Sequence, residues 1–331
     1  MAGKQANRGK QITARAWANI ALIKYWGKQG PGNAPATPSI SLALDQLATT
    51  TSVTAINRRQ DVVLIDGRST AGQARRRVLD FVDLWREHGL LAGRFRIESH
   101  NDFPTAAGLA SSASAFAALT KALAGHCEQA IGPARLSRWA RLGSGSAARS
   151  ITGGLSALGA GRDPAARLLA PAAEVPWGMV VAVVEAPAKE VSSRAGMELS
   201  RRTSPFYRAW VLTDRYHYRE LAGALKAWDL AKTGELMEEN MLAMHACMLT
   251  TQPALIYWSP ATLAVLAALR EWRKQGLAAW ATIDAGPHVA LLCHRRDLKK
   301  VAGKLKALAA AGAGIRQVIP CRPADAARVI S

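Results

Sequence analysis

Short runs of β-branched and apolar residues, bounded by turn residues, recur along the first 190 residues and predict strands. Two longer segments break this pattern. Residues 70–88 place Val78, Phe81 and Leu84 among charged residues at helical spacing, and residues 112–124 are rich in alanine, so both are expected to be helices. The strands expected in this part of the chain cover residues 12–23, 39–44, 50–56, 61–65, 94–98 and 177–184.

The pattern becomes mostly helical after about residue 190. The helices expected there cover residues 204–228, 230–250, 260–275 and 296–310, and the strands cover residues 279–283, 289–293 and 315–319. Strands and helices in mixed order, with antiparallel-type pairs, predict an α+β fold and not a doubly wound sheet. No GxGxxG motif follows a predicted strand, which argues against a dinucleotide-binding fold.

The composition fits a soluble globular protein. The chain has 331 residues, of which 49% are hydrophobic and 20% charged, enough for two domains with a sizeable core. The longest apolar runs are too short to span a bilayer, so no membrane association is expected. Four cysteines stand far apart without a CxxC pair, which disfavours zinc and disulfides and fits a reducing cytosol.

The chain is strongly basic, with a formal net charge of +19. Such a balance raises the question of a nucleic-acid partner. The cations are nevertheless spread along the chain, with short clusters at residues 75–77 and 299–306, and no aromatic-interleaved basic stripe accompanies them. We therefore expect a solvated basic surface and no nucleic acid. Part of the excess charge could raise the local concentration of small polyanionic substrates.

The most informative loop covers residues 104–113, PTAAGLASSA, which follow an expected strand and lead into the Ala-rich helix. Gly108 permits close backbone approach, and Ser111 and Ser112 offer hydroxyls. The helix start adds unpaired N–H groups and the positive end of the helix dipole. Simple helix capping is the ordinary interpretation of such a turn, but this length and composition favour an anion-binding loop. No GK[ST] follows, so it is not a Walker loop.

A second Gly/Ser loop covers residues 143–150, GSGSAARS. The hydroxyls of Ser144 and Ser146 are two residues apart, and Arg149 offers the two-pronged donor set that suits phosphate or carboxylate. A glycine-rich helix cap with a surface arginine is the alternative interpretation, and the loop alone does not decide between them.

Two strand ends carry further candidates. Lys24, Tyr25 and Lys28 follow the apolar strand of residues 12–23, where two cations and a phenol suit a phosphate group. Asp284 ends another apolar strand before a Gly-Pro turn, where a carboxylate could act as a general base. A solvated strand end and a turn-capping aspartate are the respective alternatives.

These segments together resemble a known family. The motifs "ANIALIKYWGK", "SISLALD", "NDFPTAAGLASSASAFAAL", "GSGSAARS", "KEVSSRAGMELS", "SPFYRAWV" and "IDAGPH" are similar to those of mevalonate diphosphate decarboxylases, a branch of the GHMP kinase superfamily. The resemblance runs in order from about residue 13 to about residue 293.

The resemblance implies a fold and a reaction. Residues 1–188 would form an N-terminal ATP-binding domain like domain 2 of ribosomal protein S5, and residues 189–331 a ferredoxin-like GHMP-type α+β domain, with the active site between them. ATP would phosphorylate the 3-hydroxyl of mevalonate 5-diphosphate, with Mg²⁺ bridging the ATP phosphates. Phosphate and CO2 would then leave to give isopentenyl diphosphate. A homodimer is also implied, and the cysteine usage favours a cytoplasmic location.

The resemblance further implies residue roles. Asp284 matches the catalytic aspartate that orients or deprotonates the 3-hydroxyl, Arg149 the arginine that holds the substrate carboxylate, and Ser193 a serine near the transferring phosphate. The implied substrate-binding set is Asn19, Lys24, Tyr25, Lys28, Ser144, Ser146, Arg149 and Arg194. The implied ATP-binding set is Pro104, Ala107, Gly108, Leu109, Ala110, Ser111 and Ser112. No metal ligands are identified.

Four positions depart from the family pattern, and three other functions compete. Trp17 stands where a histidine is usual, Asp102 and His288 where asparagines are usual, and Pro38 where a polar residue is usual. A decarboxylase of mevalonate 5-phosphate would need most of the same groups. A mevalonate 3-kinase would be expected to lack the catalytic aspartate or the diphosphate-binding cations, so the presence of Asp284, Lys28 and Arg194 argues against it. A non-catalytic, basic RNA-binding protein on the same fold is the alternative of another class.

Overall fold

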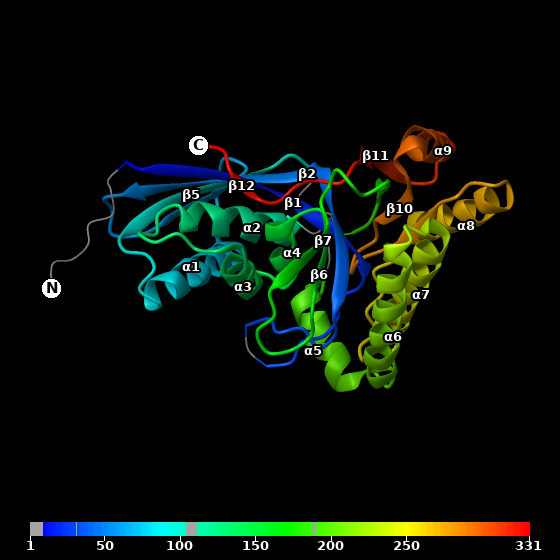
Figure 1. Cartoon of the computed structure of the whole chain (residues 1–331), viewed down its shortest axis with the longest axis horizontal. Coiled ribbons are helices and arrows are strands. Elements are labelled where there is room, and N and C mark those ends of the chain that lie inside the picture. Colours follow the sequence, from blue (N-terminus) through cyan, green and yellow to red (C-terminus); the bar gives the residue numbers. More distant parts are fainter. Residues whose placement is uncertain (1–8, 31, 104–110, 188–189) are drawn as a thin grey trace.

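The computed structural model describes residues 9–30, 32–103, 111–187 and 190–331. Within these residues, eight strands form the first sheet. Their order is β12-β1-β2-β5-β3-β4, and β6 and β7 extend it from β2 (Figure 1). The strands are β1 Gln11–Ile23, β2 Ser39–Ile56, β3 Val62–Ile65, β4 Arg68–Ser69, β5 Arg94–Asn101, β6 Leu155–Leu158, β7 Ala166–Ala170 and β12 Arg328–Val329.

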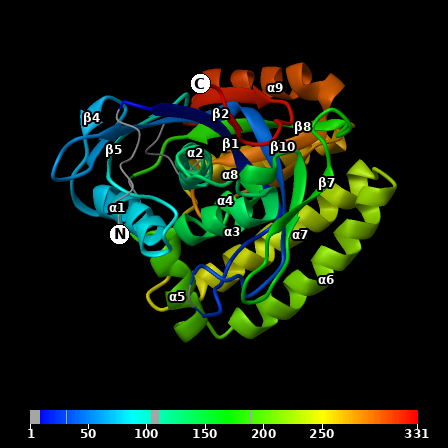
Figure 2. The ribbon, with the colours of Figure 1, turned by 60° about the vertical axis from the view of Figure 1, so that its left-hand side comes forward.

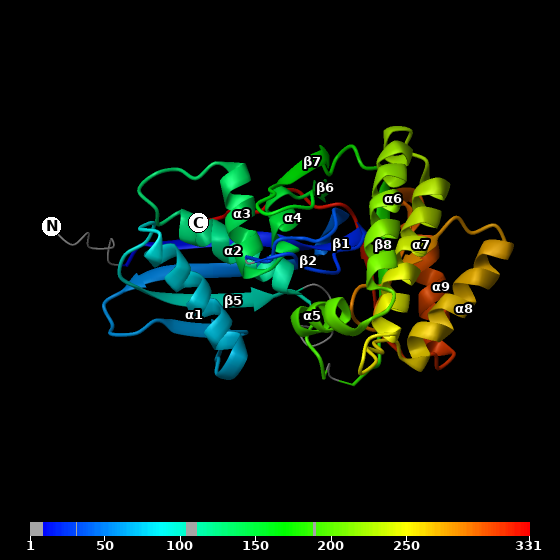
Figure 3. The ribbon, with the colours of Figure 1, turned by 90° about the horizontal axis from the view of Figure 1, so that it is seen from below.

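Helices cover one face of this sheet, as the view from below shows (Figure 3). They are α1 Gly72–Glu87, α2 Ser111–Ala124, α3 Pro133–Gly143 and the short α4 Ala147–Thr152. The apolar side of α1 buries Phe81, Val82 and Trp85 against Phe116 of α2 and Trp139 of α3. Burying large aromatic side chains is the main stabilising contribution to a core of this kind. This packing fixes the starts of α2 and α4 at the same edge of the sheet.

The second sheet contains β11-β8-β10-β9, with bounds Ile315–Cys321, Trp177–Val184, Val289–His294 and Trp280–Thr282. All residues of β8 are buried, because side chains alternate between two covered faces. Met179, Val181 and Val183 face the core shared with the first sheet, whereas Val180, Ala182 and Val184 face a core with the last helices. The sheet is therefore the middle layer of a sandwich.

The second sheet carries five helices around it: α5 Ser193–Thr203, α6 Tyr207–Lys226, α7 Leu230–Leu249, α8 Pro260–Lys274 and α9 Leu298–Ala310. Turned by 60°, the molecule shows α6 and α7 side by side, with β8 and β10 between α7 and α9 (Figure 2). Two α+β units of this construction agree with the fold class predicted from the sequence. The division at residues 188 and 189 stays a prediction, and we note that β8 pairs within the second sheet.

One pair of predicted strands is in fact a single strand. Residues 39–44 and 50–56 were expected to be separate, but β2 runs unbroken from Ser39 to Ile56. The polar Asp45 and Gln46 look like a break in the sequence. The backbone N–H of Asp45 instead donates to the Arg322 carbonyl at 3.0 Å, and its carboxylate accepts from the Arg322 N–H at 2.8 Å. Arg322 supports the strand from a distant part of the chain. The periodicity of residues 39–56 therefore gives no sign of this contact.

The other predictions differ mainly at their ends. The helices α3, α4 and α5 and the strands β4, β6, β7 and β12 were not expected, because they are short or lie in loops interpreted for their chemistry. All four cysteines are free thiols. Within the described residues, no helix combines the length and the apolar character needed to cross a membrane.

Candidate active site

A cavity of about 240 Å³ lies where the ends of β1, α2 and α4 meet the start of α5 and the loop after β9. It gathers side chains from segments that are far apart in the chain. Of the residues proposed from the sequence, the following line it: Asn19, Lys24, Tyr25, Lys28, Ser112, Ser144, Ser146, Arg149, Ser193, Arg194 and Asp284. Ser111 begins α2 without lining the cavity, and Pro104, Ala107, Gly108, Leu109 and Ala110 lie outside the described residues.

A partly buried ion pair lies at the inner end of the cavity. The Lys24 ammonium lies 2.6 Å from Oδ1 of Asp284. The Lys24 side chain is 1% exposed and that of Asp284 is 32% exposed, so the ammonium stands behind the carboxylate and the carboxylate faces the cavity. Burial lowers the pKa of Lys24, and the neighbouring Asp284 carboxylate opposes that shift. The pair therefore presents an oriented carboxylate to any ligand.

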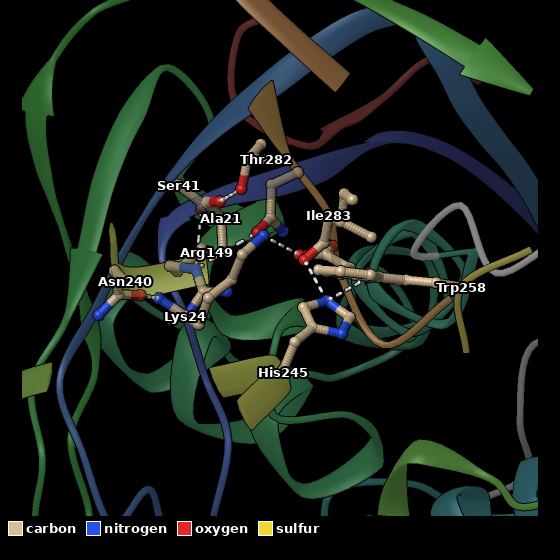
Figure 4. Close-up of polar contacts among 11 residues, drawn as sticks. Ala21, Lys24, Ser41, Arg149, Asn240, His245, Trp258, Thr282 and Ile283 are labelled. Atoms are coloured by element: carbon tan, nitrogen blue, oxygen red, sulfur yellow. Dashed lines mark hydrogen bonds and ion pairs between the residues drawn. The ribbon is translucent and has the colours of Figure 1, made fainter. Parts of the chain in front are cut away.

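Helix α7 and the strand-end backbone hold this pair in place (Figure 4). Asn240 accepts from the backbone N–H of Lys24 at 2.8 Å, and the Thr282 hydroxyl donates to the Ala21 carbonyl at 3.2 Å. His245 has its Nε2 3.3 Å from the Ile283 carbonyl and 3.4 Å from the Trp258 indole nitrogen. Burial lowers the pKa of His245 to about 3, so this imidazole is neutral and supports the backbone next to Asp284.

Arg149 lies beside the ion pair, on the short helix α4, and is 2% exposed. Its Nε donates to the Ser41 hydroxyl at 2.8 Å and contacts the Asn19 amide oxygen at 3.3 Å, and its Nη1 donates to the Ser39 hydroxyl. Burial lowers the pKa of Arg149 to about 10, which still leaves it charged at neutral pH. Among the described residues Nη2 has no partner, so this part of the guanidinium is available to a ligand.

Glycine allows Tyr25 to reach the loop of residues 143–150. A Cβ added at Gly145 would come within 2.4 Å of the Tyr25 hydroxyl oxygen, closer than real contacts allow. The same hydroxyl donates to the Asn33 carbonyl at 2.8 Å. Burial raises the pKa of Tyr25, so the phenol keeps its proton and can act as a neutral hydrogen-bond donor.

Three serine hydroxyls connect the two Gly/Ser loops. The Ser112 and Ser144 hydroxyl oxygens are 3.2 Å apart, and those of Ser144 and Ser146 are 3.3 Å apart. Across the cavity, Ser193 begins α5, after the Ser192 cap that accepts from the Ala195 N–H at 3.2 Å. Hydroxyls and a helix start that converge on one space form a site for oxyanions.

The outer end of the cavity is cationic. Lys28 donates to the Asn33 amide oxygen at 2.7 Å, and Arg194 and Arg77 lie nearby. Burial, with Arg194 and Arg77 as further causes, lowers the pKa of Lys28 to about 8. Clustered cations lower one another's pKa, and an anionic ligand stabilises their charged forms.

Sequence reasoning missed several residues around the site. They are Asn33, Ser39, Ser41, Gln73, Arg77, Asn240 and His245. Ser39 and Ser41 stand in the quoted motif "SISLALD", and the polar Asn240 and His245 interrupt an otherwise apolar helix face. The quoted motif could have pointed to Ser39 and Ser41, and the polar interruption of the helix face to Asn240 and His245. Gln73 and Arg77 reach the cavity through helix packing alone.

Three of the departures from the family pattern have local explanations. Asp102 forms an ion pair with Arg15, which neutralises the extra acid. Trp17 packs with Ala43, Ala48 and Ala324 beneath the Arg328 guanidinium, whose carbon lies 5.4 Å from the indole centroid. His288 accepts from the Val184 N–H at 3.1 Å through Nδ1. Nothing in the structure explains Pro38.

The fit of a Mg²⁺–nucleotide to this cavity can be judged from its donor set. Within the described residues, no group of three His, Cys, Asp or Glu side chains gathers as a metal site. The cavity does offer oxygens of the type that Mg²⁺ prefers, from Ser112, Ser144 and Asp284. These residues fit an ion that is held mainly by phosphates, with few protein ligands.

Fold and cavity together define a class: a small-molecule phosphotransferase-type enzyme with the GHMP kinase fold. Residues 16–168 match the family model described as "Diphosphomevalonate decarboxylase-like N-terminal domain", and residues 179–327 match "Mevalonate 5-diphosphate decarboxylase C-terminal domain". The chain therefore belongs to the mevalonate 5-diphosphate decarboxylase family.

Individual relatives agree with this assignment. The diphosphomevalonate decarboxylase of Aspergillus fumigatus is 35% identical over 326 residues, covering 90% of this chain and 80% of the relative. The crystal structure of the mevalonate diphosphate decarboxylase from Staphylococcus aureus has a TM-score of 0.91 at 34% identity, covering 99% of this chain and 100% of that one. A structure described as MDDEF in complex with MVAPP, AMPPCP and magnesium has a TM-score of 0.90 at 34% identity, covering 97% and 99%.

Proposed function

We propose that this protein catalyses the ATP-dependent decarboxylation of mevalonate 5-diphosphate to isopentenyl diphosphate, ADP, phosphate and CO2. One observation carries the proposal: the Asp284 carboxylate and the buried Arg149 guanidinium face the same cavity as a group of hydroxyls and cations. A hydroxyl to be phosphorylated, a carboxylate to be lost and a diphosphate each find a matching group there.

Different residues would contact different parts of the substrate. The Asp284 carboxylate, oriented by Lys24, accepts a hydrogen bond from the 3-hydroxyl and takes its proton during phosphoryl transfer. The free Nη2 of Arg149 donates to the substrate carboxylate. Tyr25, Lys28, Ser144, Ser146 and Arg194 bind the diphosphate, and Asn19 lies near the reacting end through its bonds to Ser150 and Arg149.

The two chemical stages balance without a redox cofactor. Transfer of the terminal phosphoryl group of ATP to the 3-oxygen releases ADP and turns a poor leaving group into phosphate. When that C–O bond breaks, positive charge develops at C3. The electron pair of the bond to the departing carboxylate then moves into the new double bond, and CO2 leaves. The cationic cavity stabilises the phosphate groups throughout by placing fixed charges near them.

The nucleotide would bind at the start of α2. The residues proposed for it within the described structure are Ser111 and Ser112, with Ser193 across the cavity near the transferring phosphate. Bound Mg²⁺ would shield the charges of the ATP phosphates. The MDDEF structure with MVAPP, AMPPCP and magnesium supports this choice of ligands for the family.

A side-by-side assay tests the proposal. Mevalonate, its 5-phosphate and its 5-diphosphate are each incubated with ATP and Mg²⁺, and ADP, phosphate and CO2 are measured separately. The proposal expects all three products from the diphosphate in equal amounts. CO2 from the 5-phosphate alone would instead identify a monophosphate decarboxylase, and ADP without CO2 a 3-kinase. If no substrate yields ADP while RNA is retained in a salt-sensitive manner, the protein is a nucleic-acid-binding protein.

Assembly and location are proposed separately. We propose a homodimer, supported by exposed apolar side chains on α6 and α7, namely Leu212, Tyr216, Leu242 and Leu249. Sedimentation at micromolar concentration would reveal a monomer if this is wrong.

A cytoplasmic location is supported by the four free cysteines, since thiols persist in reducing compartments. Imaging of a tagged chain in its own cell tests this.

A further inference from the structure

An aspartate stands in the buried face of helix α6, outside the cavity. The buried residues of this helix recur at helical spacing and are Trp210, Asp214, His217, Leu221 and Leu225. Asp214 is completely buried, which is rare for an aspartate unless a cation is paired with it. The function proposed above gives this carboxyl group no role, so its position needs another explanation.

Asp214 belongs to a hydrogen-bond chain that ends at the catalytic cavity. Its Oδ1 accepts from Nδ2 of Asn240 in α7 at 2.9 Å, and the same nitrogen lies 3.4 Å from Nδ1 of His217. Oδ1 of Asn240 accepts in turn from the backbone N–H of Lys24 at 2.8 Å (Figure 4). The Asn240 amide thus joins α6 to the end of β1, where the Lys24 ammonium meets Asp284.

Asp214 and His217 determine which way the Asn240 amide points. An amide nitrogen donates and an amide oxygen accepts, so two acceptors on the α6 side keep the nitrogen there and turn the oxygen to Lys24. His217 can accept through Nδ1 because its Nε2 lies 3.3 Å from the Glu239 carboxylate, to which it donates. Without the Asp214 acceptor, the amide could turn over and place a donor against the Lys24 N–H.

The Asp214 carboxyl group suits this position in its neutral form. Burial raises its pKa to about 8, and hydrogen bonds from Asn240 and Thr37 oppose that shift. The Thr37 hydroxyl lies beside the carboxyl group, and among the described residues neither this hydroxyl nor Oδ2 of Asp214 has another partner. A protonated acid keeps one oxygen as the acceptor for Asn240 and can donate to Thr37 through the other.

The charged groups around Asp214 agree with a neutral carboxyl group. On its own helix they are Arg215, which is exposed, and His217, whose pKa is lowered by burial. From α7 the nearest acid is Glu239, which contacts His217 and is 61% exposed. From β1, Lys24 presents its backbone N–H, because its ammonium is held in the ion pair at the cavity. No buried cation within the described residues therefore favours ionisation of Asp214.

We propose that Asp214 is a positioning residue that acts through Asn240 to hold the backbone of Lys24 and thereby aims its ammonium at the carboxylate in the cavity. A second contact of the same helix supports this role, since the Trp210 indole nitrogen donates to the Trp26 carbonyl at 2.7 Å. The predicted effect on rate rests on the function proposed above, whereas the predicted effect on the Lys24 backbone does not depend on it.

Isosteric variants test the proposal. Asp214→Asn keeps an oxygen acceptor for Asn240 and a donor for Thr37, as the neutral acid does, whereas Asp214→Leu has similar size and no acceptor. Leu221→Ala, on the same buried face of α6, is the matched control for lost packing. At pH 7 and below the Tm of each variant, kcat and KM are measured for mevalonate 5-diphosphate and ATP. Hydrogen exchange is followed by mass spectrometry in peptides that contain Lys24.

The expected result is a loss of rate that depends on the acceptor. Asp214→Leu should lower kcat by about tenfold to a hundredfold, because a displacement of about 1 Å at the reacting centre has an effect of this size. KM for both substrates should stay within about threefold, and the Lys24 amide should exchange at least about tenfold faster. Asp214→Asn should keep kcat within about threefold. Leu221→Ala should lower Tm and also keep kcat within about threefold.

Three outcomes would overturn the role of Asp214. They are a folded Asp214→Leu with normal kcat and normal Lys24 exchange, equal kcat losses in Asp214→Leu and Leu221→Ala, and a kcat loss in Asp214→Asn as large as in Asp214→Leu. If Asp214→Leu does not fold, Asp214→Ala takes its place with the same expectations. If the wild-type protein shows no turnover, the proposed function fails, and the exchange of Lys24 in the two Asp214 variants still decides the positioning role.

Discussion

The two ends of the cavity are built in opposite ways. At the inner end, Lys24 is paired with Asp284, and Arg149 is fixed by Ser39, Ser41 and Asn19. At the outer end, Lys28, Arg77 and Arg194 lie close together without a carboxylate partner among the described residues. The inner end is thus preorganised for chemistry before any ligand arrives, whereas the outer end reaches its most stable state with a polyanion bound.

The Asp284→Asn variant should show the largest effect, because it removes the oriented carboxylate at the inner end. We expect turnover to fall by about 10²–10⁴-fold, the usual contribution of a general base, while ATP affinity stays within about twofold. ADP release under saturating substrate measures the first effect, and nucleotide titration measures the second. Glu235→Gln, an exposed change on α7, serves as control. Turnover near the wild-type rate would remove Asp284 as the base.

The Arg149→Ala variant should combine loss of rate with loss of stability. The rate constant kcat should fall by about a hundredfold, as one charge-assisted contact to the reacting carboxylate is lost. Ser39, Ser41 and Asn19 would also lose a buried donor, which should lower the free energy of unfolding by about 2–4 kcal/mol. Urea unfolding followed by kinetics at low temperature separates the two. A stable variant with normal kcat would contradict this assignment of the inner end.

The outer end should respond to pH through Lys28, whose pKa is lowered to about 8. The ammonium form binds phosphate, so binding is strongest below pH 8 and weakens as the pH rises through that value. KM for the diphosphate should increase by up to about fivefold between pH 8 and pH 9, with little change in kcat. In Lys28→Ala the KM should be raised at all pH values and this slope should disappear. The same slope in the variant would exclude Lys28 as its cause.

The smallest effect is expected at a charge outside the cavity. Asp102 and Arg15 form an ion pair whose side chains are each 37% exposed. Asp102→Asn should change the free energy of unfolding by less than about 1 kcal/mol, since water screens such pairs. Because Arg15 already neutralises this acid, KM for ATP should stay within about twofold. A large drop in KM would mean that Asp102 repels the nucleotide.

Sequence reasoning found the inner end well. The residues that do the proposed chemistry follow apolar strands or stand in Gly/Ser loops, and such local patterns survive in the sequence. It identified Asp284 but not what holds its surroundings, since Asn240 contacts Lys24 and His245 contacts Ile283 from a helix far from the first strand in sequence. Periodicity reports which face of a helix is buried and not what that face touches.

The outer end and the strand pairings were harder to predict. Arg77 looks identical in sequence to its neighbours Arg75 and Arg76, and its inward position depends on the packing of α1 against Phe116 of α2. The unbroken course of β2 likewise depends on Arg322, whose contact with Asp45 spans most of the chain. Contacts between distant segments are the part of the fold that single-sequence patterns do not carry.

The return of the last residues to the first sheet affects how the cavity can open. After β11 the chain crosses back, and Ala324 bridges Ala43 and Gly154 through backbone bonds of 2.9 and 2.7 Å. The first crossing, between β7 and β8, already joins the two sheets. A body attached to another at two separated points cannot swing about either point alone. It can still rotate about the line that joins the two crossings, so we expect the span of residues 322–329 to restrict opening of the cavity to that rotation.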